Sequence, residues 1–181
     1  MLGQDLVAHN VLCDPWLPAP DNRGSPAAPR GSEVRLLALI NSPGIDHLRL
    51  TVTDIARSKK FYEHVFGWPV VVDASDRVDE PGVRDSPEQF YGGTVYRTPA
   101  GELFGLRPVA AAGEGFDSER TGLDHVSFRA DSREDLVAAR RRLEDAGIPH
   151  GDVTDLPESG LAILSFSDPD GVHLELAAAL S

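Results

Sequence analysis

A repeated pattern constrains this fold more than any other feature of the sequence. The segments IDHLRLTVTD (45–54) and LDHVSFRADS (123–132) each pass from an apolar residue through Asp-His into alternating residues. Each then leads into a helix-forming segment that ends at a glycine, Gly67 in the first copy and Gly147 in the second. Self-similarity of this kind marks repeated structural units. We therefore predict two similar modules that together form one domain.

Each copy also closes with a strand, a turn and a strand. The segments are TVYRTPAGELFGLRP (94–108) and AILSFSDPDGVHLEL (162–176). The first copy is longer because the loop-like stretch DASDRVDEPGVRDSPEQ (73–89) precedes its hairpin. Each module therefore has the predicted order βαβββ. The predicted fold is α+β, with two tandem modules forming a curved mixed sheet around a cavity and the helices outside.

The modules are expected over 44–110 and 120–178, and residues 1–43 are expected to be a flexible appendage. Residues 14–33 are rich in Pro, Gly, Ser and Asn, which is typical of segments that bury too little to fold. The apolar run VRLLALI (34–40) suits an extra strand or a docking segment. Cys13 is the single cysteine, so neither an internal disulfide nor a cysteine-based zinc site can form. A metal site would have to use His and carboxylate ligands.

The net charge of the chain limits the kinds of molecule that it can bind. The chain has 17 Lys and Arg against 29 Asp and Glu, a net charge of −12, with no run of basic residues. Such a surface repels phosphate backbones and anionic lipid, so we expect no nucleic-acid or membrane partner and favour small molecules and metal cations. No apolar run is long enough for a membrane helix, and the N-terminus carries an acid where a secretory signal carries positive charge. The expected location is cytoplasmic.

Strand alternation predicts which side chains share a face. In the first strand, Leu48, Leu50 and Val52 form an apolar face, which leaves His47, Arg49 and Thr51 on the other. The second copy repeats this arrangement and places His125, Ser127 and Arg129 on the polar face. The last strand places His173 and Glu175 opposite its apolar residues. If the polar faces line a common concave cavity, His47, His125 and Glu175 meet there.

Two imidazoles and one carboxylate are the ligand set of many non-haem Fe(II) sites, and the set also holds Mn, Zn or Ni. It leaves coordination positions open for an oxygen-bearing substrate. The alternative is that each strand histidine is only a hydrogen-bonded residue of the cavity wall. The equivalent positions of His47 and His125 in the repeat, together with Glu175, favour the metal site. His9, His64 and His150 lack this context and are expected to bind no metal.

Three further residues are candidates for substrate binding. Alternation around the first hairpin puts Arg107 on the face that carries Arg49, where the two could clamp an anionic substrate. The alternative for Arg107, which precedes Pro108 at a strand end, is a side chain that points to solvent. His173 shares a face with Glu175 and could act as an acid or base, although a supporting or packing role is preferred. No catalytic residue is assigned.

These motifs resemble the vicinal-oxygen-chelate superfamily, which includes glyoxalase I, extradiol dioxygenases, fosfomycin-resistance thiol transferases and bleomycin-binding proteins. The resemblance covers about residues 44–178 and is carried by IDHLRLTVTDIARSKKFYEHVFGW, GLDHVSFRA and SFSDPDGVHLEL. It implies the tandem-module fold. It also implies a homodimer, although two modules in one chain permit a monomer.

The resemblance also implies where ligands lie, in the first and last strand of each module. In this sequence those positions are His47, Gly105, His125 and Glu175. Gly105 has no side chain to coordinate, and glyoxalase I carries a proton-shuttling Glu there. The resemblance thus implies a three-ligand site and argues against glyoxalase I activity itself. It implies a glyoxalase- or dioxygenase-like metalloenzyme, a lyase or an oxidoreductase, with an unidentified substrate.

Three functions remain open from the sequence. The first is a divalent-metal enzyme acting on a small oxygen-bearing substrate. The second is a metal-free binding protein of the bleomycin-resistance type, whose acidic cavity would hold a cationic compound. The third is a regulatory domain that docks a partner through residues 1–43. We favour the enzyme because the binding protein and the regulatory domain do not require His47, His125 and Glu175.

Overall fold

The computed structural model describes residue 42 and residues 44–180. The chain divides into two units, Met1–Gly44 and Ile45–Ser181, and the second contains the helices and strands described below. Residues 1–41 and 43 of the expected appendage, which include His9, Cys13 and the run 34–40, lie outside the described residues. Within the described ranges, no helix is long and apolar enough to cross a membrane.

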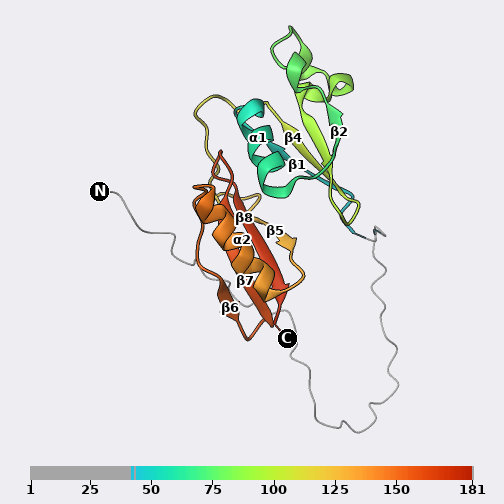
Figure 1. The fold of residues 1–181 in the computed structure, drawn as a ribbon. Coiled ribbons are helices and arrows are strands. Elements are labelled where there is room, and N and C mark those ends of the chain that lie inside the picture. The colour runs from blue at the N-terminus through green and yellow to red at the C-terminus, as the bar shows by residue number, and fades with distance from the viewer. Residues whose placement is uncertain (1–41, 43, 181) are drawn as a thin grey trace, which may run out of the picture. The chain divides into compact units, whose positions relative to one another are not determined.

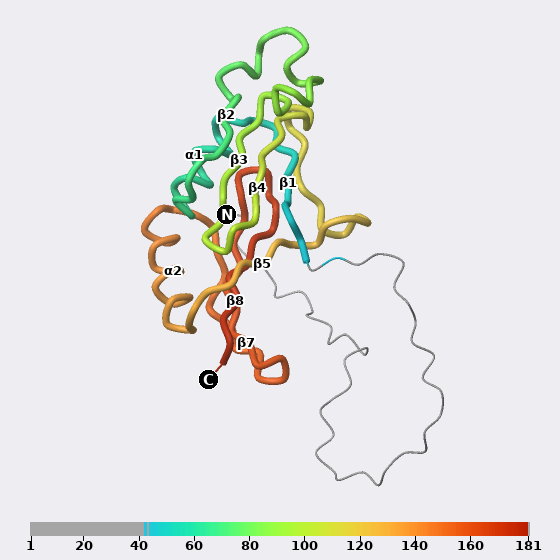
Figure 2. Tube along the Cα trace, turned by 90° about the vertical axis from the view of Figure 1, so that its right-hand side faces the viewer, coloured from blue at the N-terminus to red at the C-terminus, as the bar shows by residue number. Residues whose placement is uncertain are grey.

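The first module forms a four-stranded sheet in the order β1-β4-β3-β2. Strands β1 and β4 are parallel, and the remaining pairs are antiparallel. Figure 2 shows β1, β4 and β3 as neighbours in this order. The elements are β1 (His47–Thr51), α1 (Ile55–Phe66), β2 (Val70–Asp73), the 3-10 turns η1 (Ser75–Arg77), η2 (Val83–Asp85) and η3 (Pro87–Gly92), β3 (Thr94–Arg97) and β4 (Leu103–Arg107).

The second module repeats this arrangement in a separate sheet of order β5-β8-β7-β6, again with one parallel pair, β5 and β8. Helix α2 lies across one face of this sheet (Figure 1). Its elements are β5 (Val126–Arg129), α2 (Arg133–Asp145), β6 (Thr154–Leu156), β7 (Leu161–Ser167) and β8 (His173–Ala179). The tandem βαβββ fold predicted from the repeat is confirmed, with one mixed sheet in each module.

Both helices begin and end where local sequence signals place them. The side chain of Asp54 caps α1 by accepting a hydrogen bond from the amide of Arg57, and Ser132 caps α2 through the amide of Asp135. Gly67 and Gly147 follow the helices with φ of 61° and 67°, a left-handed conformation that favours glycine. In α2, Leu136 and Leu143 are buried, whereas Ala146, directly after the helix, is exposed.

Strand register fixes the two faces of each sheet. Leu48 and Leu50 pair with Phe104 and Leu106 on the face toward the core. On the opposite face, His47 pairs with Leu103, and Arg49 pairs with Gly105. In the second sheet, Ser127 pairs with Glu175 on the corresponding polar face. The alternation predicted from the sequence therefore holds in both modules.

Aromatic rings join the two modules. Phe66 and Trp68, at the end of α1 and just beyond it, lie with ring centroids 4.8 and 5.4 Å from Phe128 of β5. Phe104 of β4 completes the cluster, with its centroid 6.0 Å from that of Phe128. Phe104 is buried and the other three rings are partly buried, and each ring removes apolar area from water. The apolar core is therefore continuous across the repeat.

The turn Asp168-Pro169-Asp170-Gly171 also links the modules, although the sequence indicated only a turn. Asp168 and Asp170 are 5% and 8% exposed, and both accept hydrogen bonds from the first module. Tyr62 of α1 donates to Asp168 over 3.0 Å, and Thr53 and Arg57 donate to Asp170. Buried carboxylates need such partners, because an unpaired buried charge is costly.

Candidate functional site

The polar face of the second sheet brings two predicted ligands together. Nε2 of His125 lies 4.0 Å from Oε1 of Glu175. Two ligands of one metal ion at ordinary bond lengths are about 3 to 3.5 Å apart, so only a small adjustment would let both bind the same ion. The hydroxyl of Ser127 donates to the same Glu175 oxygen over 2.7 Å and holds the carboxylate in place. The pairing of β5 with β8 thus positions two of the three candidate ligands, Glu175 on β8 and His125 immediately before β5.

The aspartate of each Asp-His pair orients its neighbouring histidine. Nδ1 of His47 lies 2.9 Å from Oδ2 of Asp46, and Nδ1 of His125 lies 2.9 Å from Oδ2 of Asp124. A carboxylate only accepts, so Nδ1 donates and Nε2 keeps its lone pair. Carboxylates bound in this way to the second nitrogen are typical of metal-binding histidines. The same geometry occurs in both copies of the repeat.

The third predicted ligand lies on the other sheet. His47 begins β1, whereas His125 immediately precedes β5 and Glu175 lies on β8, both strands of the second sheet. Within the part of the chain that the structure describes, no three His, Cys, Asp or Glu side chains are grouped closely enough to hold a metal ion. The His47 and His125 side chains are 58% and 44% exposed. One chain therefore does not gather His47, His125 and Glu175 into one cluster.

The predicted substrate-binding arginines lie on the His47 face of the first sheet. A Cβ added at Gly105 would stand 3.4 Å from Cγ and Nε of Arg49, so the Arg49 side chain covers the place where a residue 105 side chain would project. Arg107 is partly buried rather than fully solvent-facing, and its guanidinium carbon stands 3.8 Å from the centroid of the Tyr91 ring. The corresponding distance for Arg49 is 5.9 Å.

The other histidines occupy varied surroundings. His173 is exposed at the start of β8, with its ring centroid 5.6 Å from that of Phe116. Nδ1 of His150 lies 2.7 Å from the backbone oxygen of Gly151, and this oxygen accepts a hydrogen bond from Nδ1. His64 lies on α1, at the edge of an apolar groove.

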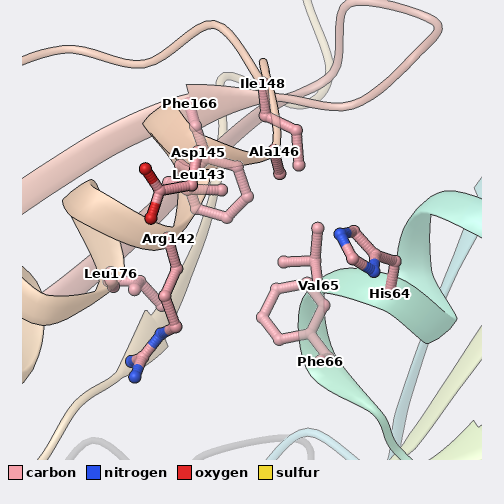
Figure 3. A pocket seen from close by; sticks show the side chains of 11 residues that line it. His64, Val65, Phe66, Arg142, Leu143, Asp145, Ala146, Ile148, Phe166 and Leu176 are labelled. Atoms are coloured by element: carbon pink, nitrogen blue, oxygen red, sulfur yellow. The ribbon is translucent and has the colours of Figure 1, made fainter.

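That groove has a volume of about 590 Å³ and lies between the ends of α1 and α2 (Figure 3). Val65 and Phe66 of α1 face Leu143, Ala146 and Ile148 across it. Leu176 also lines the groove, and it alternates along β8 with Glu175. The groove is therefore on the opposite face of the sheet from the candidate metal ligands.

The largest pKa shifts lie outside this candidate site. Burial raises the pKa of the Tyr62 hydroxyl, and the adjacent Asp168 raises it further. Burial also raises the pKa of Asp168, although hydrogen bonds from Val172, Tyr62 and Asp170 oppose the shift. Burial likewise raises the pKa of Tyr96. These shifts mark groups inside the packed modules rather than groups exposed on the polar faces.

Sequence reasoning missed several residues that shape the site. Asp46 and Asp124 were visible as half of the repeated Asp-His pair, and their repetition was the signal for their role. Ser127 was placed on the correct face without a role. Tyr91 had no signal, because it lies in the irregular stretch before β3, where periodicity carries no information.

Comparison with known proteins identifies the family of the fold. A family model for the glyoxalase/bleomycin resistance protein/dioxygenase superfamily matches residues 44–176. This chain belongs to that superfamily. A search of curated proteins finds no match.

Solved structures of other proteins share the fold. A glyoxalase/bleomycin resistance protein/dioxygenase domain from Frankia sp. EAN1pec is 30% identical, with a TM-score of 0.62 over 77% of this chain and 99% of that one. A glyoxalase/dioxygenase from Nostoc punctiforme is 23% identical, with a TM-score of 0.59 over 81% and 97%. A mutant of the fosfomycin resistance protein FosX from Listeria monocytogenes, solved with Mn(II) and 1S,2S-dihydroxypropylphosphonic acid, is 16% identical, with a TM-score of 0.57 over 77% and 94%.

Proposed function

We propose that this protein is a divalent-metal-dependent enzyme of the glyoxalase/dioxygenase type, a lyase or an oxidoreductase. Its metal ligands would be His47, His125 and Glu175, and its substrate a small oxygen-bearing molecule. The repeated Asp-His geometry carries the proposal, because in both copies it leaves the Nε2 lone pair available to a metal ion on an exposed polar face. The position of Glu175, held by Ser127 and 4.0 Å from His125, supplies the anion of the ligand set.

The chain's own residues would do most of the positioning. Asp46 and Asp124 keep the imidazoles in the tautomer that binds a cation, and Ser127 fixes the carboxylate. A bound divalent cation would act as a Lewis acid on substrate oxygens. The Mn(II) in the FosX structure supports manganese as one candidate beside Fe, Zn and Ni. Arg49, Arg107 and His173 would contact the substrate.

We also propose that two chains complete each metal site. His47 of one chain would join His125 and Glu175 of another, because these residues lie on separate sheets and form no three-ligand group within one described chain. A twofold dimer makes such sharing reciprocal, so each dimer would contain two sites. The exposure of both histidine side chains leaves them accessible to a second copy.

Metal content tests the ligand assignment. We would purify the full chain without oxygen or chelators and measure Fe, Mn, Zn and Ni by elemental mass spectrometry. We expect near-stoichiometric metal that is lost in His47→Ala, His125→Ala and Glu175→Gln. His64→Ala, on the exposed surface of α1, serves as the matched control and should retain it. Metal-free protein even after reconstitution would contradict the proposal and favour the metal-free binding protein.

A mixing experiment tests the sharing between chains. His47→Ala and Glu175→Gln should each lack metal alone. After unfolding and refolding together in equal amounts, half of the dimers would contain one intact site, which restores about a quarter of the wild-type metal content. A site built within one chain predicts no recovery at all, so that result would exclude the shared site while leaving the ligand assignment intact.

A further inference from the structure

The first sheet carries two arginines that lack a carboxylate partner. Among the described residues, neither Arg49 nor Arg107 forms an ion pair or donates a side-chain hydrogen bond to another group. Other arginines of this acidic chain form ion pairs with carboxylates: Arg57 pairs with Asp170, and Arg133 pairs with Asp155. Nε of Arg107 is buried and makes no hydrogen bond. A buried donor without a partner costs stability, so the hydrogen bonding of Arg107 is incomplete, whereas Arg49 is exposed and its donors face solvent.

These two arginines lie close together and beside His47. Arg49 is two residues after His47 on β1, which puts it about 7 Å further along the same face. Thr51 of β1 pairs with Arg107 of β4, so both guanidinium groups project from neighbouring strands. Two like charges held this close repel each other. An anion bound between them would remove that repulsion and could accept bidentate hydrogen bonds from each.

Tyr91 holds the pair in place. Its ring centroid is 3.8 Å from the guanidinium carbon of Arg107 and 5.9 Å from that of Arg49, distances at which an aromatic face attracts a cation. Phe90 and Tyr91 have φ of 50° and 59°, in the left-handed region that residues other than glycine rarely adopt. Strained backbone of this kind is concentrated at ligand-binding sites, where the surrounding structure maintains it.

We propose that Arg49 and Arg107 bind an anionic oxygen group of the substrate, a carboxylate or a phosphonate, and that Tyr91 is the positioning residue that keeps Arg107 oriented for it. Arg49 covers Gly105, so the site offers positive charge where a longer residue 105 side chain would otherwise project. The inference rests on the proposed function, because an anion bound beside His47 becomes a substrate only if His47 belongs to the metal site.

Anion binding to the metal-free protein tests this inference separately from metal binding. We would titrate the full chain, stripped of metal and dialysed free of chelator, with inorganic phosphate, methylphosphonate and acetate. The Nε–Hε signals of Arg49 and Arg107 would be followed by nuclear magnetic resonance. We expect saturable shifts of both signals, and the anion with the strongest response distinguishes phosphonate from carboxylate recognition. An equal response would support recognition of the shared oxyanion chemistry.

Variants then assign the contacts. Arg107→Gln and Arg49→Gln should weaken binding by about tenfold or more, because each removes charge-assisted hydrogen bonds. Tyr91→Leu should weaken it by about threefold, whereas Tyr91→Phe keeps the ring and should bind like the wild type. Arg141→Gln, which removes one exposed charge from α2, is the matched control and should have no effect. Thermal unfolding of each variant verifies that it is folded.

Two results would overturn the inference. One is the absence of saturable shifts with any of the three anions. The other is binding that survives in Arg49→Gln and Arg107→Gln, or that falls equally in Arg141→Gln, since either outcome would mean only general attraction to surface charge. His125→Ala separates the two proposals, because it should abolish metal binding and leave anion binding unchanged. If the wild-type protein binds the anion but binds no metal, the proposed function is refuted and the anion site is not.

Discussion

At the scale of single residues, the Asp-His pairs give the most direct prediction. Replacing Asp124 by Ala removes the carboxylate that holds the Nδ1 proton of His125. The imidazole would then change tautomer and orientation freely, so we expect the metal affinity of the reconstituted protein to fall by about tenfold or more. Competition with a chromogenic chelator measures this affinity. Asp131→Ala, a nearby exposed acid, is the control, and equal affinity in both variants would mean that Asp124 has no orienting role.

A second residue-scale prediction concerns Asp73 at the end of β2. Burial raises its pKa, but hydrogen bonds from Lys59, Ser75 and Thr94 outweigh that effect and lower it to about 2. A carboxyl whose pKa is lower in the folded than in the unfolded state stabilises the fold above its unfolded pKa. That contribution disappears as the pH falls from about 4 toward 2. The side chain is 37% exposed, so solvent screening reduces the contribution to about 1 kcal/mol.

Chemical denaturation at several pH values checks this. We expect Asp73→Asn to unfold about 1 kcal/mol more easily than the wild type near neutral pH and equally easily near pH 2. Asp76→Asn, on the exposed η1 turn, should differ from the wild type at neither pH. A deficit that persists unchanged near pH 2 would mean that ionisation of Asp73 is not its source.

At the scale of elements, the connection from η3 to β3 depends on one glycine. An ideal Cβ at Gly93 would stand 2.1 Å from the backbone oxygen of Leu106 and 2.9 Å from that of Phe90. Gly93→Ala must therefore move β3 away from β4 or displace η3, at a cost of about 3 kcal/mol in the free energy of unfolding. Gly44→Ala has no atom within 4 Å of the added carbon and should be neutral. Denaturant titration of both variants makes the comparison, and similar stabilities would contradict the close approach.

At the scale of the whole molecule, substitutions at two tyrosines compare a hydrogen bond between the modules with the packing of a buried ring. The Tyr62 hydroxyl donates to the buried Asp168 of the other module, whereas the equally buried Tyr96 hydroxyl has no hydrogen-bond partner among the described residues. Tyr62→Phe should lower the free energy of unfolding by about 1 to 2 kcal/mol, because Asp168 loses a donor. Tyr96→Phe should be neutral or stabilising, because it removes an unpaired polar group.

Thermal unfolding by calorimetry compares the two variants under the same conditions. Both changes delete one oxygen and preserve the ring, so the difference between them combines the loss of the Tyr62–Asp168 hydrogen bond with the removal of the unpaired Tyr96 hydroxyl. If Tyr96→Phe proves the more destabilising change, the link through Asp168 contributes little to holding the modules together.

The sequence alone was sufficient for the modules and their faces. Asp-His pairs, helix-ending glycines and the two closing hairpins repeat at equivalent places, and strand alternation then placed His125 and Glu175 on the polar faces of their own segments. These features depend on local chemistry, in which a cap, a turn residue or a period of two acts within a few residues. For the same reason, the predicted face for Arg49 and Arg107 agrees with the observed register.

Only the tertiary structure decided how the polar faces of the two sheets lie relative to the candidate ligands. The sequence predicted that His47 would meet His125 and Glu175 in one cavity, yet the described chain carries them on separate sheets. The contact of Tyr91 with Arg107 and the burial of Asp168 and Asp170 under α1 were equally invisible. Such contacts join residues far apart in the chain, and their energies depend on how complete modules and irregular loops pack together. Local sequence patterns therefore do not predict that packing.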